Sequence, residues 1–258
     1  MSSISLFNLN IMHGRNLRSP IFPLWVSRQR AQDNLQKIAD LINEYDSDTV
    51  TLQEVDQVSV LSGDFNQFDY LGERLHYAYK FFSPSCSVRI FGKSIFVSGN
   101  AIFSKYPLEN CESFKFDFSF PTERQGFVIA DVKLPNGLIF AITSIHLVYL
   151  DWLRLNSRIK QLNVIRRVIE KREKEVVISG DINCDFFGKE ISLRSFVNQL
   201  NLKVYEPENK NLNTYPSWSP AKRIDWILSS KELNFISYKT ISTRVSDHLA
   251  VFADLNIT

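Results

Sequence analysis

The chain has 258 residues, of which 44% are hydrophobic and 22% charged, and its 30 Lys and Arg against 28 Asp and Glu leave a net charge of +2. These values are typical of a globular protein with a large core, and they exclude an intrinsically disordered chain. A near-neutral chain gives no overall sign of binding to nucleic acid, to a membrane surface or to an acidic partner, so any such function must be argued from local features.

The cysteines and the N-terminus bear on the compartment. Cys86, Cys111 and Cys184 are far apart in the sequence, which argues against a disulfide framework and against a zinc site. The first residues lack the basic and apolar regions of a signal peptide, and no apolar run approaches the ~18 residues of a membrane span. We therefore expect a cytoplasmic monomer without a transmembrane segment. Export by a route without a cleaved signal stays open.

Strand and helix patterns alternate in the first half of the chain. Alternating apolar residues predict a strand over 3–11, and apolar residues at three- and four-residue spacing predict an amphipathic helix over about 29–45. A β-branched run predicts a strand over 48–55, which places Glu54 at a strand end. A run rich in β-branched and aromatic residues predicts a further strand over 94–104.

The next elements are a hairpin and a second helix. Strands predicted over 127–134 and 138–147 flank the turn residues Pro135-Asn136-Gly137. Apolar spacing predicts a helix over about 152–173. Its outer face is expected to be basic, with Arg154, Arg158, Lys160, Arg166, Arg167, Lys171, Arg172 and Lys174.

The last strands complete a layered fold. A buried strand over 176–179 stops at Gly180-Asp181, and two more strands are predicted over 223–229 and 249–257. No repeat and no Gly/Ser/Pro-rich linker divides the chain, so we expect a single domain over residues 1–258. Hairpins mixed with helical crossovers predict two sheets with helices outside them, which is a layered α/β (α+β) sandwich.

Polar residues recur where the predicted strands end. Each alone has an ordinary explanation, as a turn cap, a solvated strand end or a core histidine. Together they indicate one rim, because burying several ionised carboxylates is costly unless a cation compensates for them. Carboxylate and amide oxygens without thiolates suit Mg²⁺ or Mn²⁺, and such an ion beside histidines suits hydrolysis of a phosphate ester. The residues are Asn10, Glu54, His146, Asp181, Asn183, Asp225, Asp247 and His248.

Seven short segments around these residues resemble, in their order, the endonuclease/exonuclease/phosphatase superfamily. They are Asn8-Leu9-Asn10-Ile11, Leu52-Gln53-Glu54-Val55, Gly99-Asn100-Ala101-Ile102, Ser144-Ile145-His146-Leu147, Gly180-Asp181-Ile182-Asn183, Arg223-Ile224-Asp225-Trp226-Ile227 and Ser246-Asp247-His248-Leu249. The group contains deoxyribonuclease I, apurinic endonucleases, neutral sphingomyelinases, deadenylases and inositol polyphosphate 5-phosphatases. The resemblance runs from about residue 4 to 255.

The resemblance implies a four-layered α/β sandwich of two packed mixed sheets, with the site at one edge. It implies that Glu54 is the principal metal ligand and that Asp247 and Asn10 complete or support the coordination sphere. Asp181 would orient or deprotonate the attacking water, and Asn183 would hold that water or a phosphate oxygen.

The resemblance also assigns the imidazoles. His248 would contact the scissile phosphate, and Asp225 would orient and charge that imidazole. His146 would be a second phosphate contact or the proton donor to the leaving oxygen.

Two departures narrow the branch of the superfamily. Apurinic endonucleases resemble one another in having an acidic residue at the position of Met12. They have Tyr at the position of His146. This favours the His-type branch of deoxyribonuclease I, sphingomyelinases and deadenylases. The segment 214–220 lacks the Pro-Ala-Trp-Cys-Asp-Arg pattern of the 5-phosphatases and is similar to that of many generic bacterial members.

Substrate contacts are expected in loops. Arg124 stands where family members often carry a phosphate-binding arginine, Asn100 is a candidate cleft amide, and Trp218 is either a cleft aromatic or a core residue. Basic and aromatic residues interleave over 13–30, which suits a phosphate backbone with exposed bases or a connector packed on the sheet. The basic helix face at 152–174 either tracks phosphates or is simply solvated.

Three functions stay open. The motifs and the basic-aromatic segments favour a Mg²⁺- or Mn²⁺-dependent phosphodiesterase that cleaves DNA or RNA. Near-neutral charge and the apolar segment from Ile21 to Val26 favour a hydrolase of phospholipids or small phosphoesters, such as a sphingomyelinase-like enzyme or a phosphatase. A binding protein that has lost catalysis ranks last, because every motif residue is present.

Overall fold

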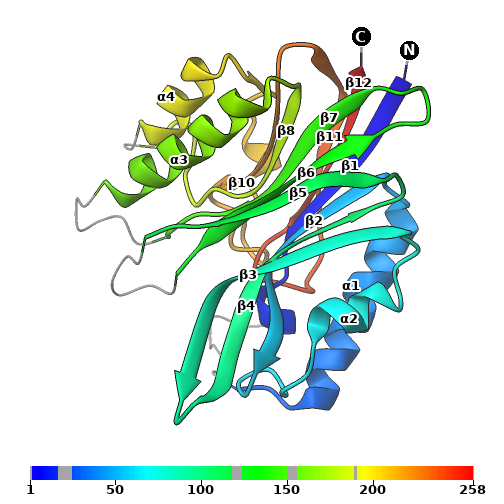
Figure 1. The fold of residues 1–258 in the computed structure, drawn as a ribbon, viewed down its shortest axis with the longest axis vertical. Coiled ribbons are helices and arrows are strands. Elements are labelled where there is room, and N and C mark those ends of the chain that lie inside the picture. Colours follow the sequence, from blue (N-terminus) through cyan, green and yellow to red (C-terminus); the bar gives the residue numbers. More distant parts are fainter. Residues whose placement is uncertain (1, 17–24, 118–123, 150–155, 189–190, 258) are drawn as a thin grey trace.

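The computed structural model describes residues 2–16, 25–117, 124–149, 156–188 and 191–257, which form two facing β-sheets (Figure 1). The first sheet contains β1 (Ser2–Asn10), β2 (Thr49–Ser59), β3 (Tyr79–Ile90), β4 (Lys93–Ser104), β11 (Leu233–Ile241) and β12 (Ala250–Ile257). The second contains β5 (Leu108–Lys115), β6 (Gly126–Lys133), β7 (Ile139–His146), β8 (Val176–Asp181), β9 (Lys203–Val204) and β10 (Asp225–Ser229). Their orders are β11-β12-β1-β2-β4-β3 and β5-β6-β7-β8-β10-β9.

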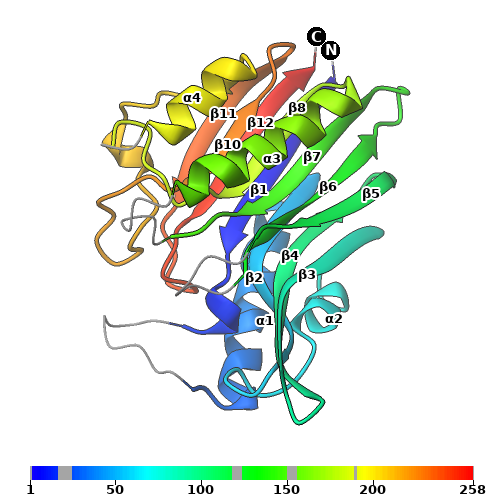
Figure 2. The same ribbon diagram turned by 60° about the vertical axis from the view of Figure 1, so that its left-hand side comes forward.

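Helices cover the outer face of each sheet, as two views of the ribbon show (Figures 1 and 2). The helices are α1 (Arg28–Tyr45), α2 (Gln67–Gly72), α3 (Ser157–Arg172) and α4 (Ser192–Gln199), with short 3-10 helices η1 (Met12–Gly14) and η2 (Lys210–Leu212). Leu35 and Ile38 of α1 share a buried cluster with Phe7 of β1. On the other side, Ile165 of α3 shares a buried cluster with Trp226 of β10.

The space between the two sheets holds a third apolar cluster. It joins Leu6 and Val251 of the first sheet to Ala130, Ile142 and Val177 of the second. Apolar side chains therefore face both sides of each sheet, which explains why the strands are continuous apolar runs. The result is helix, sheet, sheet, helix, and it confirms the predicted four-layered sandwich.

Toward one end, the contact between the sheets becomes polar. Gln53 Nε2 of β2 donates to Ser144 Oγ of β7 at 2.9 Å, and Thr51 Oγ1 of β2 lies 2.7 Å from Ser179 Oγ of β8. Because these hydroxyl and amide groups are buried, hydrogen bonds across the interface fix the two sheets relative to each other. This end is the one where the predicted site residues gather.

The predicted elements are largely those observed, with several additions. The strand predicted over 223–229 begins at Asp225, and the helix predicted over 152–173 is described from Ser157 to Arg172. Sequence patterns did not predict α2, α4, β3, β5, β9 or β11. No helix among the described residues is long and apolar enough to cross a membrane.

The expected basic face of the second helix is wrong in part. Arg158 is buried and donates to the backbone oxygens of Val148 and Tyr149. Arg172 pairs with Asp131 at 2.6 Å, a carboxylate that Lys174 also contacts. These cations neutralise or satisfy groups of the protein itself, so they do not form a free track for phosphates.

Candidate active site

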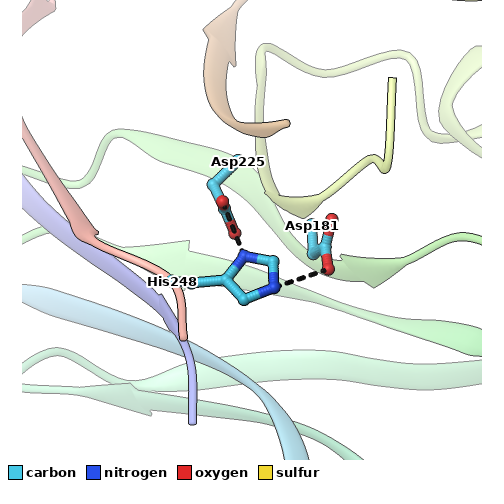
Figure 3. A group of neighbouring side chains, drawn as sticks. All are labelled: Asp181, Asp225 and His248. Carbon is cyan, nitrogen blue, oxygen red and sulfur yellow. Dashed lines mark hydrogen bonds and ion pairs between the residues drawn. The ribbon is translucent and has the colours of Figure 1, made fainter. Parts of the chain in front are cut away.

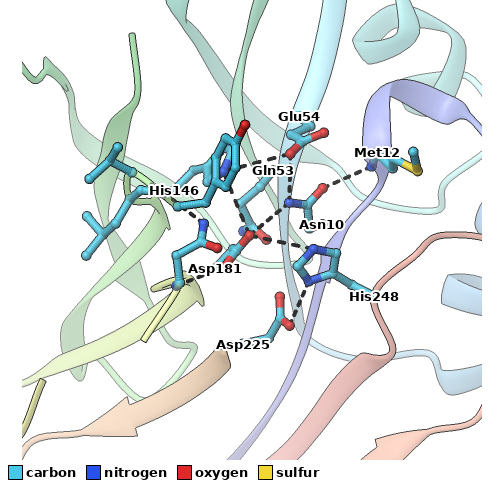
Figure 4. Close-up of polar contacts among 12 residues, drawn as sticks. Asn10, Met12, Gln53, Glu54, His146, Asp181, Asp225 and His248 are labelled. Atoms are coloured by element: carbon cyan, nitrogen blue, oxygen red, sulfur yellow. Dashed lines mark hydrogen bonds and ion pairs between the residues drawn. The ribbon is translucent and has the colours of Figure 1, made fainter. Parts of the chain in front are cut away.

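The predicted catalytic side chains converge on one edge of the sandwich, where strands of both sheets end (Figure 4). Asn10 ends β1 and Glu54 lies in β2 of the first sheet. In the second sheet, His146 ends β7, Asp181 ends β8 and Asp225 begins β10. His146 pairs with Asp181, and Asp181 pairs with Asp225, so three neighbouring strands present these side chains at one level.

Glu54 reaches the rim through an irregularity in its strand. The pairing of β2 with β4 shifts register between Leu52 and Val55, and Glu54 has a φ of 56°. Such a bulge re-aims a side chain, and a non-glycine residue with positive φ is uncommon. The carboxylate accepts a hydrogen bond from Asn10 Nδ2 at 3.1 Å and lies 3.1 Å from His13 Nε2.

The environment of Glu54 favours its ionised form. Burial raises the pKa of this carboxyl, but the imidazoles of His13 and His146 and the amide of Asn10 lower it more, to about 2. Glu54 is therefore an anion throughout the neutral range. A buried carboxylate of this kind is a ready ligand for a hard cation.

Asp181 is placed by the glycine before it. Gly180 has a φ of 147°, and a Cβ there would lie 2.1 Å from the carbonyl oxygen of Ile145. Only glycine fits this close approach of β8 to β7. Asp181 Oδ1 accepts from the backbone N–H of Asn183 at 2.9 Å, and its Oδ2 accepts from Asn10 Nδ2 at 3.1 Å.

The environment of Asp181 disfavours its ionised form. Burial, opposed by His248 and reinforced by Asp225, raises the pKa of Asp181 to about 6. A carboxyl with such a pKa can accept a proton near neutral pH and release it again.

His248 and Asp225 form a hydrogen-bonded pair (Figure 3). His248 Nδ1 lies 2.8 Å from Asp225 Oδ2, and His248 Nε2 lies 3.8 Å from Asp181 Oδ2. Thr214 Oγ1 accepts from the backbone N–H of Asp225 at 3.2 Å and fixes the start of β10. Burial lowers the pKa of His248, but Asp225, Asp247 and Asp181 raise it well above its usual value. The surrounding carboxylates therefore favour the cationic form of the imidazole.

Ser246 ties the loop before β12 to the end of β1. Its hydroxyl donates to the backbone oxygen of Asn10 at 2.6 Å and accepts from the backbone N–H of His248 at 3.2 Å. The neighbouring Asp247 is almost completely buried. Burial raises the pKa of Asp247, His248 lowers it, and the nearby charge of Glu54 raises it again, with a net increase. Two carboxylates that repel each other in this way would be relieved by a shared cation.

Asn10 bridges the two halves of the site. Its Nδ2 donates to Glu54 and to Asp181 at 3.1 Å each, while its Oδ1 accepts from the backbone N–H of Met12 at 2.9 Å. The amide oxygen is thus engaged within its own loop. In this arrangement the Asn10 amide nitrogen holds the two carboxylates in place. Its amide oxygen is turned to Met12 and is not offered to a metal ion.

His146 faces both carboxylates at longer range. Its Nε2 lies 3.8 Å from Glu54 Oε1 and 3.8 Å from Asp181 Oδ2. Both distances exceed a hydrogen bond, so the interaction is coulombic. Asn183 donates from Nδ2 to the backbone oxygen of Leu147 at 2.9 Å, which links the loop after β8 to the loop after β7.

Sequence reasoning missed the position of His13, which it placed in a basic-aromatic segment. The structure instead packs His13 into the site, with Nδ1 2.6 Å from Asp56 Oδ1 and Nε2 3.1 Å from Glu54 Oε2. Its side chain is only 12% exposed. The available signal was its place three residues after Asn10 and two residues after the end of the first motif.

The three predicted substrate residues lie differently. Asn100 is buried between the sheets and donates from Nδ2 to the backbone oxygen of Gly126 at 2.8 Å. Trp218 is partly exposed beside Ser217, whose backbone N–H donates to the oxygen of Asp247 at 2.7 Å. Arg124 is exposed just before β6. Arg18, Phe22, Trp152 and Arg154 lie outside the described residues.

Two groups of side chains, with no residue in common, could hold a metal ion. Asp181, Asp225 and His248 bring one ligand atom each within 4.8 Å of one another. In that group, His248 Nδ1 is already hydrogen-bonded to Asp225, so this nitrogen is not free to bind a metal ion. The other group is Glu54 with Asp247, whose carboxylate oxygens suit a hard divalent cation.

A comparison with family profiles identifies the family of this chain. A profile of the Endonuclease/Exonuclease/phosphatase family matches residues 10–248. No curated protein sequence matches the chain significantly.

Solved structures share the fold at low sequence identity. An endonuclease/exonuclease/phosphatase from Beutenbergia cavernae superposes with a TM-score of 0.76 and 18% identity, over 99% of this chain and 72% of that one. The catalytic domain of human Nocturnin gives 0.71 and 19%, over 99% and 94%. A mannosyl-6-phosphatase from Bacteroides thetaiotaomicron gives 0.73 and 14%, over 98% and 100%.

Proposed function

The chain belongs to the endonuclease/exonuclease/phosphatase family, and on that premise we propose that it is a Mg²⁺- or Mn²⁺-dependent phosphodiesterase that cleaves DNA or RNA by attack of water on phosphorus. One observation carries the proposal. Two carboxyls at the same edge are shifted in opposite directions, with the pKa of Glu54 lowered to about 2 and that of Asp181 raised to about 6. The first suits a metal ligand and the second a proton acceptor.

The donor set fits a hard divalent cation. Glu54 is an anion at neutral pH, and Asp247 is a second buried carboxyl whose pKa is raised partly by the charge of Glu54. We assign the metal to these two residues, with Asn10 holding Glu54 in place. A cation bound there would neutralise the oxygens of the phosphoryl group.

Asp181 is the proposed general base. Its Oδ1 is held by the backbone N–H of Asn183, so its Oδ2 faces the imidazoles of His146 and His248, each 3.8 Å away. Asp181 accepts a proton from the attacking water as the new bond from oxygen to phosphorus forms. Asn183 positions that water or a phosphate oxygen.

The two imidazoles act on the phosphate and on the leaving group. His248 is held cationic by Asp225 and stabilises the negative charge that develops on the phosphoryl oxygens. His146 donates a proton to the leaving oxygen as its bond to phosphorus breaks. His146 acts from the end of β7, and His248 acts from a loop that Ser246 ties to the end of β1, so little reorganisation is needed during the reaction.

A basic cavity supports a polyanionic substrate. A cavity of about 440 Å³ is lined among the described residues by Gly14, Arg15, Asn16, Val26, Arg30, Asp33, Asn34 and Lys37. It adjoins the catalytic loops, because Asn34 Nδ2 donates to the backbone oxygens of Gly14 and of Val245. Arginine and lysine side chains at this place suit phosphates on either side of the scissile one.

A second candidate is hydrolysis of phospholipids. The observation that favours it is a group of exposed apolar side chains at the tip of the β3–β4 hairpin, where Phe91 is fully exposed. In this case the same metal, base and imidazoles would act on the phosphodiester of a lipid headgroup.

The test is hydrolysis of plasmid DNA, single-stranded RNA, sphingomyelin and phosphoinositides, with Mg²⁺, with Mn²⁺ and with a chelator. Glu54→Gln is the matched control, because it removes one charge and keeps the shape. We expect nucleic-acid cleavage that requires the metal and is lost in the variant. Cleavage confined to a lipid would establish the second candidate, and activity that survives the chelator would contradict both.

A further inference from the structure

The hairpin of β3 and β4 extends beyond the catalytic edge (Figures 1 and 2). Ser98 of β4 pairs with Asp56, close to Glu54, and from there β4 runs back to Lys93 at the tip. At about 3.3 Å per residue, the tip lies roughly 20 Å from the level of Glu54. β3 is the edge strand of its sheet, so no further strand of this sheet covers that side of the hairpin.

The tip residue is unusual in two independent ways. Phe91 is 104% exposed. It also has a φ of 46° and precedes Gly92 with a φ of 77°, between the paired residues Ile90 and Lys93. Asn-Gly is the pair that such a two-residue turn prefers, and a bulky aromatic in this conformation is strained. An aromatic side chain that stabilises neither the turn nor a core is accounted for by contact with something outside the chain.

Other apolar side chains are exposed at the same end. Of the fourteen large hydrophobic side chains that are exposed among the described residues, six lie here, so they form a patch and are not scattered. They are Trp25, Val60, Leu61, Val88, Ile90 and Phe91. Backbone hydrogen bonds join the segments that carry them: Val60 N donates to Ile95 O of the hairpin at 3.1 Å, and Val26 N, next to Trp25, donates to Leu61 O at 2.9 Å. We call these six residues the apolar end.

The charges around the apolar end have one dominant sign. Residues 75–108 contain no Asp or Glu, and the exposed cations Lys80, Arg89 and Lys93 lie along the hairpin. Arg89 and Lys93 flank the tip directly. The nearest exposed acid on the adjoining turn is Asp64, whose backbone oxygen accepts from Arg28. An apolar tip flanked by cations is complementary to an anionic lipid surface. The apolar side chains match the acyl chains, and the cations match the headgroup phosphates.

We propose that the apolar end docks on an anionic phospholipid membrane, with Phe91 and Ile90 inserted among the acyl chains and Arg89 and Lys93 on the headgroup phosphates. Docking in this way brings the catalytic edge to face the membrane at a short distance. The patch is largely aliphatic, which favours lipid over nucleobases, because bases stack on aromatic faces. Docking does not depend on which phosphoester is hydrolysed.

The test is cosedimentation of the full chain with vesicles of phosphatidylcholine, with and without phosphatidylglycerol. The key variant is Phe91→Asn, because asparagine suits the turn, so the fold is expected to be kept or slightly stabilised. We expect this variant to lose about 10- to 100-fold in vesicle affinity, the factor for burying one large apolar side chain. Arg89→Ser with Lys93→Ser is expected to abolish the preference for phosphatidylglycerol.

The matched control is Ile236→Asn, which removes another exposed apolar residue, 60% exposed, from β11 at the opposite edge of the same sheet. It is expected to bind vesicles like the wild-type chain. The proposal is overturned if the wild-type chain does not bind vesicles, or if Phe91→Asn and Ile236→Asn bind equally well. It is also overturned if Phe91 is needed only for self-association in sedimentation velocity, or only for binding lipid-free DNA or RNA.

Discussion

The two halves of the catalytic edge shift the pKa of a carboxyl in opposite directions. On the first sheet, burial of Glu54 is outweighed by the imidazoles of His13 and His146 and by the amide of Asn10, and its pKa falls to about 2. On the second sheet, burial of Asp181 prevails, and its pKa rises to about 6. The two side chains share a hydrogen-bond donor in Asn10. The side chain of Glu54 is 19% exposed and that of Asp181 only 2%, so the difference comes from the neighbouring charges together with the depth of burial.

This difference separates two roles that one reaction requires. A metal ligand must be an anion at all working pH values, whereas a base must be able to bind and release a proton. Pairs of titratable groups whose surroundings move their pKa values apart mark such a division of labour. If Glu54 and Asp181 differ in this way, substitutions at the two positions will have distinct effects on metal binding, pH dependence and stability.

The largest effect is expected from replacing each carboxyl by its amide. Glu54→Gln and Asp181→Asn should each lower the rate of phosphoester hydrolysis by about 10²–10³ or more. Metal binding should distinguish them, because only Glu54 is assigned as a ligand. Titration calorimetry with Mn²⁺ is therefore expected to show weak binding by Glu54→Gln and nearly unchanged binding by Asp181→Asn. Equal losses of metal affinity in the two variants would contradict the assignment of Glu54 alone as a metal ligand.

A smaller effect is expected from Asp225→Asn. The charge of Asp225 raises the pKa of His248, so the variant should lower that pKa and shift the alkaline limb of the pH–rate profile to lower pH. The rate at the optimum should fall by about 10²-fold, within the range for general acid–base groups. Proton NMR of the His248 ring measures the pKa directly. If the alkaline limb of the pH–rate profile did not move, Asp225 would not set the pKa of His248 and would have only a structural role.

The metal-free protein should show opposite effects of the two carboxyls on stability. Glu54 has a pKa below the usual 4.5, so it stabilises the fold above pH 4.5 and loses this contribution as pH falls toward 2. Asp181 has a pKa above the usual 3.8, so its contribution is full below pH 3.8 and is lost as pH rises through about 6.

At neutral pH, Glu54→Gln should accordingly be less stable than the wild-type chain, and Asp181→Asn more stable. Each difference should be about 1–3 kcal/mol, on the scale of ~1.4 kcal/mol per pKa unit. Urea denaturation in the presence of a chelator measures both. The gain from Asp181→Asn should vanish below about pH 4, because the carboxyl is then protonated in both states. Changes of the same sign in the two variants would contradict the comparison.

Sequence patterns predicted the layers and the convergence of the site, because residues at the ends of neighbouring parallel strands meet at one sheet edge. His146 and Asp181 are of this kind, on the parallel pair β7 and β8. The patterns did not predict how Glu54 is aimed, because the bulge in β2 depends on pairing with β4, a strand about 40 residues away. They also missed the hairpin tip, since Phe-Gly is not a usual turn pair.

The smallest effect concerns His13, which sequence reasoning placed in a substrate-contact or connector segment and not among the catalytic residues. His13 lowers the pKa of Glu54 and is not among the groups that set the pKa of Asp181. His13→Gln should therefore raise the pKa of Glu54 toward its usual value and leave that of Asp181 near 6. Carbon-detected NMR titration of the metal-free protein resolves the two carboxyls separately. If both pKa values moved together, the two halves of the edge would be one coupled site, and the division between ligand and base would fail.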